Sequence, residues 1–208
     1  MRAIPEPSKR RLVLLERLLS ESDRKTVTSS QLAELTGWSS AVIRRDISLL
    51  DIRCGASNGY KVSQLREALA QLVNDRQKEK RCCIVGLGRM GQMLLDTEEL
   101  EGSSFKLVAG FDSSVNRTEI LHSVFPLHPT TMLESVIRSE GIEYAILTVE
   151  KNEAQETADR LSECGIKGIV NYTPEVLTVP QNVAVENVSL LTALEILSAN
   201  TVGNQYIK

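Results

Sequence analysis

The chain has 208 residues, of which 42% are hydrophobic and 25% charged, with 24 Lys+Arg against 27 Asp+Glu. This composition excludes a disordered chain, and the length allows one large or two small domains. No apolar run approaches the roughly 20 residues of a membrane span, and the N-terminus lacks the apolar stretch of a signal peptide. We therefore expect a cytoplasmic protein without a membrane partner. The four cysteines show no CxxC spacing, which argues against a metal site or a disulfide framework.

The charge is distributed unevenly along the chain. Residues 1–81 carry 16 Lys+Arg against 10 Asp+Glu, a net charge of +6, whereas residues 82–208 carry 8 against 17, a net charge of −9. This asymmetry argues against one uniform domain. We expect a domain boundary in the charged segment at residues 75–81.

Two amphipathic helices are predicted at the start of the basic part. Leucines at three- and four-residue spacing form the apolar face of the first helix, over residues 9–19: Leu12, Leu15, Leu18 and Leu19. Residues 20–27 are typical of a turn. The second helix begins at Ser29 and ends at Gly37, the residue type favoured after a helix C-terminus. Its buried residues are expected to be Leu32, Ala33 and Leu35.

A third helix follows at once, capped by Ser39 or Ser40. Its apolar face comprises Val42, Ile43, Ile47 and Leu50. Two helices joined by a short glycine turn form a helix-turn-helix, whose second helix enters the major groove of DNA. Arg44, Arg45 and Ser48 lie off the apolar face, and the arginine fork pairs with guanine or clamps a phosphate. An ordinary three-helix unit with a solvated charged face is the alternative.

Residues 47–62 predict a β-hairpin, the wing of a winged helix. The segment holds a short apolar strand, a turn at Ser57, Asn58 and Gly59, and a second strand over 60–62. Such a wing tracks the phosphate backbone, and the cations available to it are Arg53 and Lys61. A fourth helix, over 63–75, leads into the charged linker. The predicted DNA-binding residues are Ser39, Ser40, Arg44, Arg45, Ser48 and Lys61.

A dinucleotide-binding fingerprint follows the linker. An apolar strand at 82–85 precedes the loop Gly86, Leu87, Gly88, Arg89, Met90 and Gly91, which opens a helix. A second strand, from Phe105, ends at Asp112, twenty-one residues after Gly91. Glycines permit the tight turn, the approach of a pyrophosphate and close helix packing, while the acid accepts hydrogen bonds from the adenosine ribose. We therefore predict NAD(H) as the cofactor. A glycine turn that serves packing alone is the alternative.

The remaining residues continue the alternation of strands and helices. We expect strands over 142–149, 167–170 and 183–185, and helices over 153–164 and 190–198. This order predicts an α/β domain with a doubly wound parallel sheet, whose ligand crevice lies at the carboxyl ends of the strands. Thr148, Asn171 and Tyr172 are therefore further candidates for cofactor binding, with Tyr172 equally interpretable as a half-buried core residue.

No catalytic set accompanies this fold. The only histidines, His122 and His128, fall in the loop-like stretch 121–129, and no Tyr-x-x-x-Lys pair occurs. Cys82 and Cys83 lie on the expected first strand, where thiols behave as small hydrophobes. A DNA-reading head, a dinucleotide-binding body and no catalytic set indicate a transcription factor rather than an enzyme.

The sequence resembles the Rex family of redox-sensing repressors over nearly its whole length. SSAVIRRDISLL resembles the recognition helix of that family, RCCIVGLGRMG its nucleotide loop, and GIKGIVNYTPEVLTVPQNVAVENVSLL its C-terminal part. The resemblance implies a homodimer that binds operator DNA with NAD⁺ or without ligand and leaves when NADH binds. It also implies that dimerisation runs through Leu190 onward, since the last helix of the family reaches into the partner subunit.

Several positions depart from the family pattern. Where the family has Tyr-Phe-Gly at the end of the recognition helix, this chain has Leu49, Leu50 and Asp51. Where the wing of the family has Arg-Gly, it has Ala56 and Ser57. Glu150 replaces an expected proline. The resemblance also implies a redox switch formed by an arginine, a tyrosine and an aspartate. This chain keeps the arginine as Arg17, with Thr97 at the tyrosine position and Ser189 at the aspartate position. We therefore expect weaker discrimination of NADH from NAD⁺.

Three domains are expected. They are a winged-helix DNA-binding domain at 1–78, a Rossmann NAD(H)-binding domain at 79–189, and a dimerisation helix and tail at 190–208. Two other functions fit parts of the sequence. A repressor that responds to sugar phosphates opens with a similar helix-turn-helix but does not need the glycine loop. A small NAD-dependent oxidoreductase needs a substrate and a proton donor.

Overall fold

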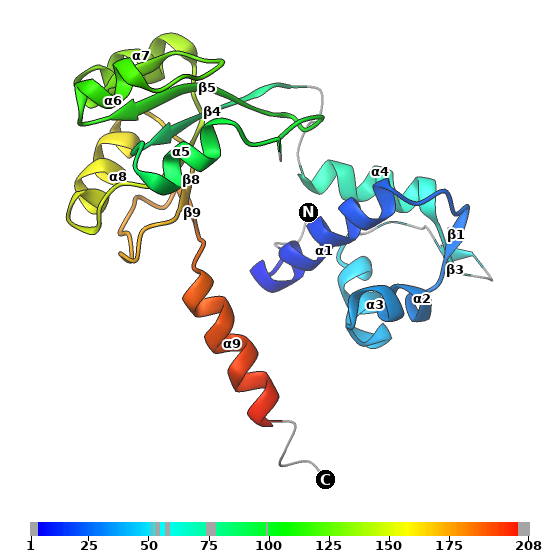
Figure 1. The fold of residues 1–208 in the computed structure, drawn as a ribbon. Coiled ribbons are helices and arrows are strands. Elements are labelled where there is room, and N and C mark those ends of the chain that lie inside the picture. The colour runs from blue at the N-terminus through cyan, green and yellow to red at the C-terminus, as the bar shows by residue number, and fades with distance from the viewer. Residues whose placement is uncertain are drawn as a thin grey trace. The chain divides into compact units, whose positions relative to one another are not determined.

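The computed structural model describes residues 4–50, 52, 55–56, 59–73, 78–98 and 100–203 (Figure 1). These divide into two compact units, Met1–Lys78 and Glu79–Lys208. Asp51, Arg53, Ser57 and Asn58, which the sequence places in or before the wing, lie outside the described residues.

Four helices form the first unit. They are α1 (Glu6–Ser20), α2 (Ser29–Thr36), α3 (Ser40–Ser48) and α4 (Val62–Val73). Their apolar faces meet in one core, whose buried residues are Leu12, Leu15, Leu19, Val27, Leu32, Ile43, Ile47, Val62, Leu65 and Leu69. Two residues expected in this core are instead exposed, Leu18 by 40% and Leu35 by 61%. Leu18 is exposed although Leu15 and Leu19 are buried, and Leu35 is exposed although Leu32 is buried, so the buried face of each helix is narrower than the periodicity predicts.

The helix-turn-helix is held by local capping. Thr28 caps α2, accepting a hydrogen bond from the Gln31 N–H, while the Gln31 side chain accepts one from the Thr28 N–H. Gly37 ends α2 in the left-handed region, with φ of 73°. Of the two serines expected to cap α3, Ser39 does so, accepting a hydrogen bond from the Val42 N–H at 3.3 Å. The turn between the two helices is therefore fixed at both ends.

The wing is a small antiparallel sheet rather than a simple hairpin. Strand β3 (Gly59–Lys61) pairs with β2 (Gly55–Ala56) on one side and with β1 (Thr26–Val27) on the other. The first strand was expected too early, since Ile47 belongs to α3, and β1 falls where a turn was expected. Gly59 must stay small here, because a Cβ would lie 2.6 Å from the Val27 carbonyl oxygen.

A buried ion pair joins α1 to α3. Arg11 donates from Nε to Asp46 Oδ2 at 2.6 Å and from Nη2 to Asp46 Oδ1 at 3.0 Å, a two-pronged contact. The Asp46 side chain is 1% exposed. Burial by itself would raise the pKa of Asp46, but hydrogen bonds from Arg11 and Ser8 and the charges of Arg11 and Arg45 hold it below its usual value.

Replacing Asp46 by asparagine should lower the free energy of unfolding of the first unit by about 2–4 kcal/mol, because Arg11 loses its charged partner. The lowered pKa means that the carboxylate stabilises the fold fully above the unfolded-state pKa of about 3.9, and that this contribution is lost as the pH falls through the folded pKa. Urea unfolding followed by the fluorescence of Trp38, the only tryptophan, measures both effects. Asp23→Asn, on the exposed turn before β1, is the control. Equal stability of the two variants would contradict the prediction.

The second unit is built on a six-stranded parallel sheet. Its strands are β4 (Lys80–Val85), β5 (Phe105–Asp112), β6 (Leu127–Pro129), β7 (Tyr144–Leu147), β8 (Gly168–Asn171) and β9 (Ala184–Asn187). Their spatial order is β6-β5-β4-β7-β8-β9, and every neighbouring pair is parallel. This is the doubly wound order of a dinucleotide-binding fold, in which the order reverses between β4 and β7. The predicted fold class is therefore confirmed.

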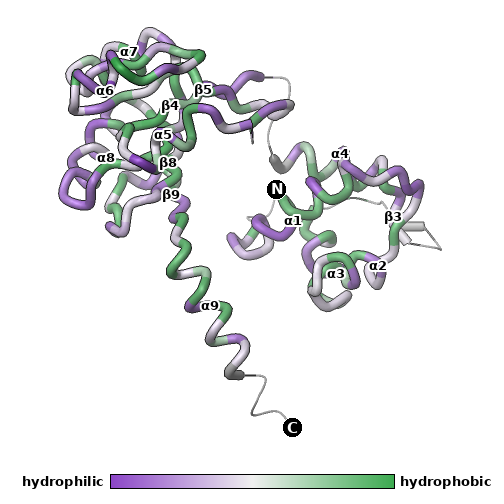
Figure 2. The backbone as a smooth tube through the Cα atoms, in the orientation of Figure 1, coloured by the Kyte–Doolittle hydropathy of each residue, from purple (hydrophilic) through white to green (hydrophobic). Residues whose placement is uncertain are grey.

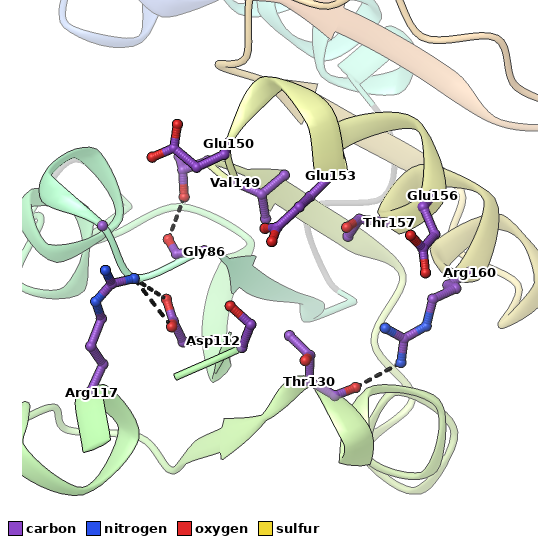
Figure 3. A pocket seen from close by; sticks show the side chains of 13 residues that line it. Gly86, Asp112, Arg117, Thr130, Val149, Glu150, Glu153, Glu156, Thr157 and Arg160 are labelled. Carbon is purple, nitrogen blue, oxygen red and sulfur yellow. Dashed lines mark hydrogen bonds and ion pairs between the residues drawn. The ribbon is translucent and has the colours of Figure 1, made fainter. Parts of the chain in front are cut away.

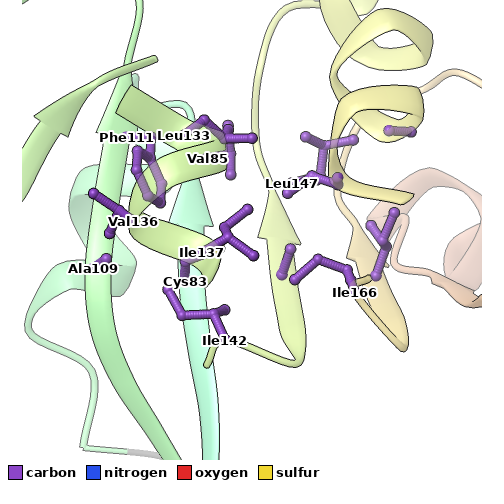
Figure 4. Packing of buried hydrophobic residues seen from close by; sticks show 14 of the residues in the cluster. Cys83, Val85, Ala109, Phe111, Leu133, Val136, Ile137, Ile142, Leu147 and Ile166 are labelled. Atoms are coloured by element: carbon purple, nitrogen blue, oxygen red, sulfur yellow. The ribbon is translucent and has the colours of Figure 1, made fainter. Parts of the chain in front are cut away.

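Both faces of the sheet are covered. α7 (Leu133–Glu140) and α8 (Ala154–Glu163) pack on the face that holds Cys83 and Val85, forming the larger core (Figure 4). α5 (Arg89–Leu95) and residues 121–125 pack on the opposite face, against Ile84. Central strands covered on both sides are buried throughout, which explains the apolar runs of the sequence.

Several elements of this unit were not expected from the sequence. α6 (Val115–Ile120) and α7 lie in segments for which the sequence predicted no element, and β6, which holds His128, falls in the stretch 121–129 interpreted as loop-like. β4 begins at Lys80, inside the expected linker. β7 ends at Leu147, so that Thr148 and Val149 follow the strand rather than belong to it. Two short 3₁₀ helices lead into α7 and α8: η1 (Thr130–Met132) and η2 (Lys151–Glu153).

The last described helix has no separate polar face. α9 (Leu190–Gly203) is largely hydrophobic along its length (Figure 2), and every described side chain from Leu190 to Thr201 is exposed. Leu190 and Leu191 are exposed by 78% and 66%. An apolar helix of this kind needs to be covered by another surface. Among the described residues, no helix is long and apolar enough to cross a membrane.

Candidate functional site

The glycine loop joins β4 to α5 and has no room for side chains at two of its positions. Gly86 has φ of 98°, and a Cβ there would lie 2.6 Å from the Val149 nitrogen. A Cβ at Gly91 would lie 1.9 Å from the Gly86 carbonyl oxygen. Gly88 differs, because nothing lies within 4 Å of the position that its Cβ would take. The loop therefore needs Gly86 and Gly91 for its own packing and leaves open space at Gly88.

Two side chains from neighbouring strands fix the shape of the loop. The Thr148 hydroxyl, just after β7, donates a hydrogen bond to the Gly86 carbonyl at 2.6 Å. Asp112, at the end of β5 and 2% exposed, accepts one from the Leu87 N–H at 2.6 Å and one from the Ser114 N–H at 2.7 Å. Each carboxylate oxygen also accepts a hydrogen bond from Arg117, and a ligand hydroxyl bound here would replace that arginine.

A cavity of about 330 Å³ opens at the carboxyl ends of these strands (Figure 3). It runs from the glycine loop past Asp112 to the ends of β6 and β7. Its lining is mainly polar: Gly86, Gly88, Asp112, Ser113, Arg117, Thr130, Thr148, Val149, Glu150, Glu153, Glu156, Thr157 and Arg160. The volume is in the usual range of small-molecule sites, and the location is the ligand crevice of this fold class.

Both arginines of the cavity are held by carboxylates. Arg117 Nη1 lies 3.3 Å from each oxygen of Asp112, and its side chain is 51% exposed. Arg160 donates to Glu134 Oε1 and to the Thr130 carbonyl, each at 2.7 Å. The single hydrogen bond between Arg160 and Glu134 lowers the pKa of Glu134 and raises the pKa of Arg160. Arg160 thus fixes α8 against η1 and α7.

The cavity brings together some of the predicted cofactor residues. Gly86, Gly88, Asp112 and Thr148 line it, and Leu87 and Gly91 are buried in the loop itself. The other four do not line it. Arg89 and Met90 are exposed on α5, Tyr172 follows β8, and Asn171 is fully buried. The Asn171 side chain is occupied by hydrogen bonds with Thr173, Glu175 and Asn187, which order the loop after β8.

The sequence interpretation missed the far end of the cavity. Thr130, Glu153, Thr157 and Arg160 come from η1, η2 and α8, which follow β6 and β7. The rule that ligands lie beyond the carboxyl ends of parallel strands could have found the three that follow β7. It could not find Thr130, because β6 was not recognised.

The predicted DNA-binding residues lie around α3 and the wing. Arg44 and Arg45 are exposed, and Arg44 Nη1 donates to Ser29 Oγ at 3.3 Å. Ser39 caps the helix and Ser40 begins it, while the Ser48 hydroxyl donates to the Arg45 carbonyl at 2.6 Å. Lys61 is exposed on β3. Exposed cations at a helix that follows a tight turn are suited to DNA phosphates and base edges.

The two residues predicted for the redox switch lie in different units. Arg17 is exposed on α1. Ser189 precedes α9, and its hydroxyl accepts a hydrogen bond from the Thr192 N–H at 3.2 Å. Ser189 therefore caps the last helix, a role that aspartate also fills well.

Cys82 and Cys83 are poorly suited to redox sensing. Cys82 and Cys83 are buried on β4, and burial raises the pKa of Cys82 to about 11 and that of Cys83 further. Thiolate, the reactive form, is therefore scarce at neutral pH. Among the described residues, no group of His, Cys, Asp or Glu is arranged to hold a metal ion.

Comparison with known proteins identifies the family. Residues 3–48 match the model described as a putative DNA-binding protein N-terminus, and residues 77–175 match the CoA binding domain. The redox-sensing transcriptional repressor Rex of Listeria welshimeri is 34% identical over 197 residues, which cover 93% of this chain and 91% of the relative. This chain belongs to the Rex family. The Rex of Ligilactobacillus salivarius is also 34% identical, over 93% of this chain and 92% of its own.

Solved structures of a Rex repressor have the same fold. The Rex-family repressor RSP in complex with β-NAD⁺ and operator DNA is 29% identical, with a TM-score of 0.87 over 99% of this chain and 95% of that one. RSP in complex with β-NADH is 30% identical, with a TM-score of 0.83 over 99% and 97%. The resemblance to Rex is confirmed, and membership places this chain among transcriptional repressors rather than enzymes.

Proposed function

We propose that this Rex protein represses transcription by binding operator DNA through α3 and the wing, and that NADH binding in the second unit releases it. The observation that carries the proposal is the open space at Gly88 beside Asp112, within a fold shared with a repressor solved with NAD⁺ and operator DNA. The first unit is basic, as expected of a unit that binds DNA, and the acidic unit is the one that binds the nucleotide.

The residues of the second unit fit a dinucleotide in a definite direction. The pyrophosphate lies against Gly88 and the start of α5, where no side chain caps the helix among the described residues. Asp112 accepts hydrogen bonds from the adenosine ribose, and Thr148 keeps the loop in shape by holding Gly86. The nicotinamide ring supplies the signal, because it is positively charged in NAD⁺ and neutral in NADH.

The apolar α9 supports a homodimer. Its side chains from Leu190 to Thr201 are exposed in the single chain, and burying them against a second copy offsets the cost of association. A two-fold dimer carries two α3 helices and binds a pseudo-palindromic operator with half-sites about one helical turn, or a multiple, apart. The proposed location is the cytoplasm, where the operator DNA lies.

The other two functions have less support. A sugar-phosphate effector does not account for the open space at Gly88 in the glycine loop. An oxidoreductase is disfavoured because the described lining of the cavity has no histidine, tyrosine or lysine to act as its proton donor. Thermal-shift titration of the protein with NADH, NAD⁺, NADPH and sugar phosphates separates these functions. We expect stabilisation by NADH and release of a retarded operator fragment in the same concentration range. Stabilisation by sugar phosphate alone, or turnover of NADH with no effect on DNA binding, would refute the proposal.

The protein should bind NADH more tightly than NADPH, by about tenfold or more. The carboxylate of Asp112 repels a 2′-phosphate and loses its ribose hydrogen bonds to that ligand. Arg117 opposes this preference, since it is half exposed and can turn from Asp112 toward the phosphate. Fluorescence titration with both nucleotides measures the ratio, and Arg117→Ala should weaken NADPH binding more than NADH binding. Equal affinities of the unmodified protein would refute the assignment of Asp112.

Aspartate at position 189 should strengthen the release from DNA by NADH. The resemblance to the family implies a carboxylate there that senses the nicotinamide charge, a differential interaction of about 1–3 kcal/mol. Ser189→Asp should therefore lower the NADH:NAD⁺ ratio needed to release operator DNA, by about fivefold or more. Gel retardation of operator DNA, titrated with NADH at fixed NAD⁺, measures this ratio.

Ser189→Asn is the matched control for that experiment. Asparagine caps a helix as well as aspartate does but carries no charge, so it keeps the hydrogen bond to Thr192 without the proposed sensor. Equal release ratios for the aspartate and asparagine variants would show that charge at this position does not take part in the switch.

A further inference from the structure

We call the end of the cavity beyond Asp112 its second compartment. The residues that form it are Thr130, Glu153, Thr157 and Arg160. In Figure 3, Asp112 lies between Arg117 on one side and Thr130 and Arg160 on the other. If the pyrophosphate lies at Gly88 and the ribose at Asp112, as proposed above, the base attached to that ribose falls in this compartment. This step rests on the proposed function, and it fixes which part of the ligand these four residues meet.

Two polar side chains of this compartment have no hydrogen-bond or ion-pair partner among the described residues. Thr157 is 9% exposed, and its hydroxyl makes no hydrogen bond with any described residue. Glu153 is half-buried at the start of α8, and its carboxylate makes no hydrogen bond or ion pair within the described part of the chain. Both groups line the cavity, so a ligand bound there can form hydrogen bonds with them.

Arg160 gives the compartment a rigid end. Its guanidinium is held by Glu134 and by the Thr130 carbonyl, from two different elements. One turn of helix separates Thr157 from both Glu153 and Arg160, so the same face of α8 presents all three. The positions of the free carboxylate and the free hydroxyl are therefore set by a fixed helix.

We infer that Glu153 and Thr157 recognise the 6-amino edge of adenine, and so determine which base of a dinucleotide the protein accepts. The carboxylate of Glu153 accepts a hydrogen bond from the amino group, because an ionised carboxylate can only accept. The hydroxyl of Thr157 donates to an adjacent ring nitrogen. Hypoxanthine carries a carbonyl oxygen in place of the amino group, and that oxygen would face the Glu153 carboxylate with no proton between them.

Binding of NADH and of reduced nicotinamide hypoxanthine dinucleotide tests this assignment. The two ligands differ in the 6-substituent of the base and in the proton that hypoxanthine carries on N1. By fluorescence titration we expect the unmodified protein to bind NADH at least tenfold more tightly, since a misplaced buried acceptor is costly. Glu153→Gln should reduce this ratio to near one, because a carboxamide can donate to the carbonyl or accept from the amino group.

Thr157→Val should act differently from Glu153→Gln. A hydroxyl both donates and accepts, so its loss should lower the affinity for both ligands by about threefold to tenfold. The ratio of the two affinities should stay unchanged. The control is Glu163→Gln, an exposed residue of the same helix outside the cavity, which should bind both ligands as the unmodified protein does.

The outcomes separate this inference from the proposed function. Equal affinity of the unmodified protein for the two ligands, or an unchanged ratio in Glu153→Gln, would overturn the assignment of Glu153 while leaving NADH as the ligand. Unchanged binding of both ligands by Thr157→Val would overturn the assignment of Thr157. If the unmodified protein bound neither ligand, the proposed function would fail as well.

Discussion

Replacing Arg44 and Arg45 together by alanine should reduce specific operator binding by at least 100-fold without changing the affinity for NADH. Both side chains are exposed on α3, the second helix of the helix-turn-helix, and neither packs in the core of the first unit. Each arginine that contacts a base edge or a phosphate contributes about 1–3 kcal/mol, and one decade of affinity corresponds to about 1.4 kcal/mol. Gel retardation with operator DNA measures the loss, and fluorescence titration measures NADH binding.

A control of equal charge separates recognition from general electrostatics. Lys9→Ala with Lys106→Ala removes the same two positive charges from exposed positions outside α3 and the wing. This variant should bind the operator within about threefold of the unmodified protein. Lys61→Ala, on the wing, should weaken specific and non-specific DNA about equally and reduce the salt dependence, because a phosphate contact carries no sequence information. Retained operator binding by the Arg44 and Arg45 variant would refute the assignment of the recognition helix.

The parts of the fold that the sequence predicted are those with strong local signals. The segment from β4 to β5 was expected almost as it occurs, as a strand, a glycine loop, a helix and a second strand. Its strands are buried on both faces, and Gly86 and Gly91 stand where a side chain would not fit. α6 and β6 were missed for physical reasons. α6 has six residues and no buried side chain, and β6 is a three-residue strand that ends in Pro129. Neither leaves a periodic pattern in the sequence.

Contacts between residues far apart in the chain could not be predicted from the sequence either. The contact of Arg11 with Asp46 spans 35 positions, and β1 has only two residues, which pair with β3. The same holds for the site. Gly86, Gly88 and Asp112 belong to a fingerprint with fixed spacing, whereas Glu153 and Thr157 reach the cavity only through a turn after β7. Tertiary structure, not local pattern, brings these residues together.

Replacing Gly88 by alanine should weaken NADH binding by about 100-fold and leave the fold intact. Its φ of −68° suits any residue, and apart from the two neighbours in the chain no described residue has an atom within 4 Å of the added Cβ. The methyl group would therefore occupy only the space in which we place the pyrophosphate. Since close approach of the phosphates to the loop backbone is the reason for a glycine here, the loss should be about 2.7 kcal/mol of binding free energy. Fluorescence titration measures the affinity, and thermal unfolding measures the stability.

Gly91→Ala gives the contrasting result. Its Cβ would lie 1.9 Å from the Gly86 carbonyl oxygen, so α5 must move relative to the loop, and both the melting temperature and NADH affinity should fall. Gly102→Asn is the neutral control, because this glycine has open space around it and a φ of 70°, which asparagine tolerates. If Gly88→Ala bound NADH as tightly as the unmodified protein, the pyrophosphate could not lie at this loop, and the direction proposed for the whole ligand would be wrong.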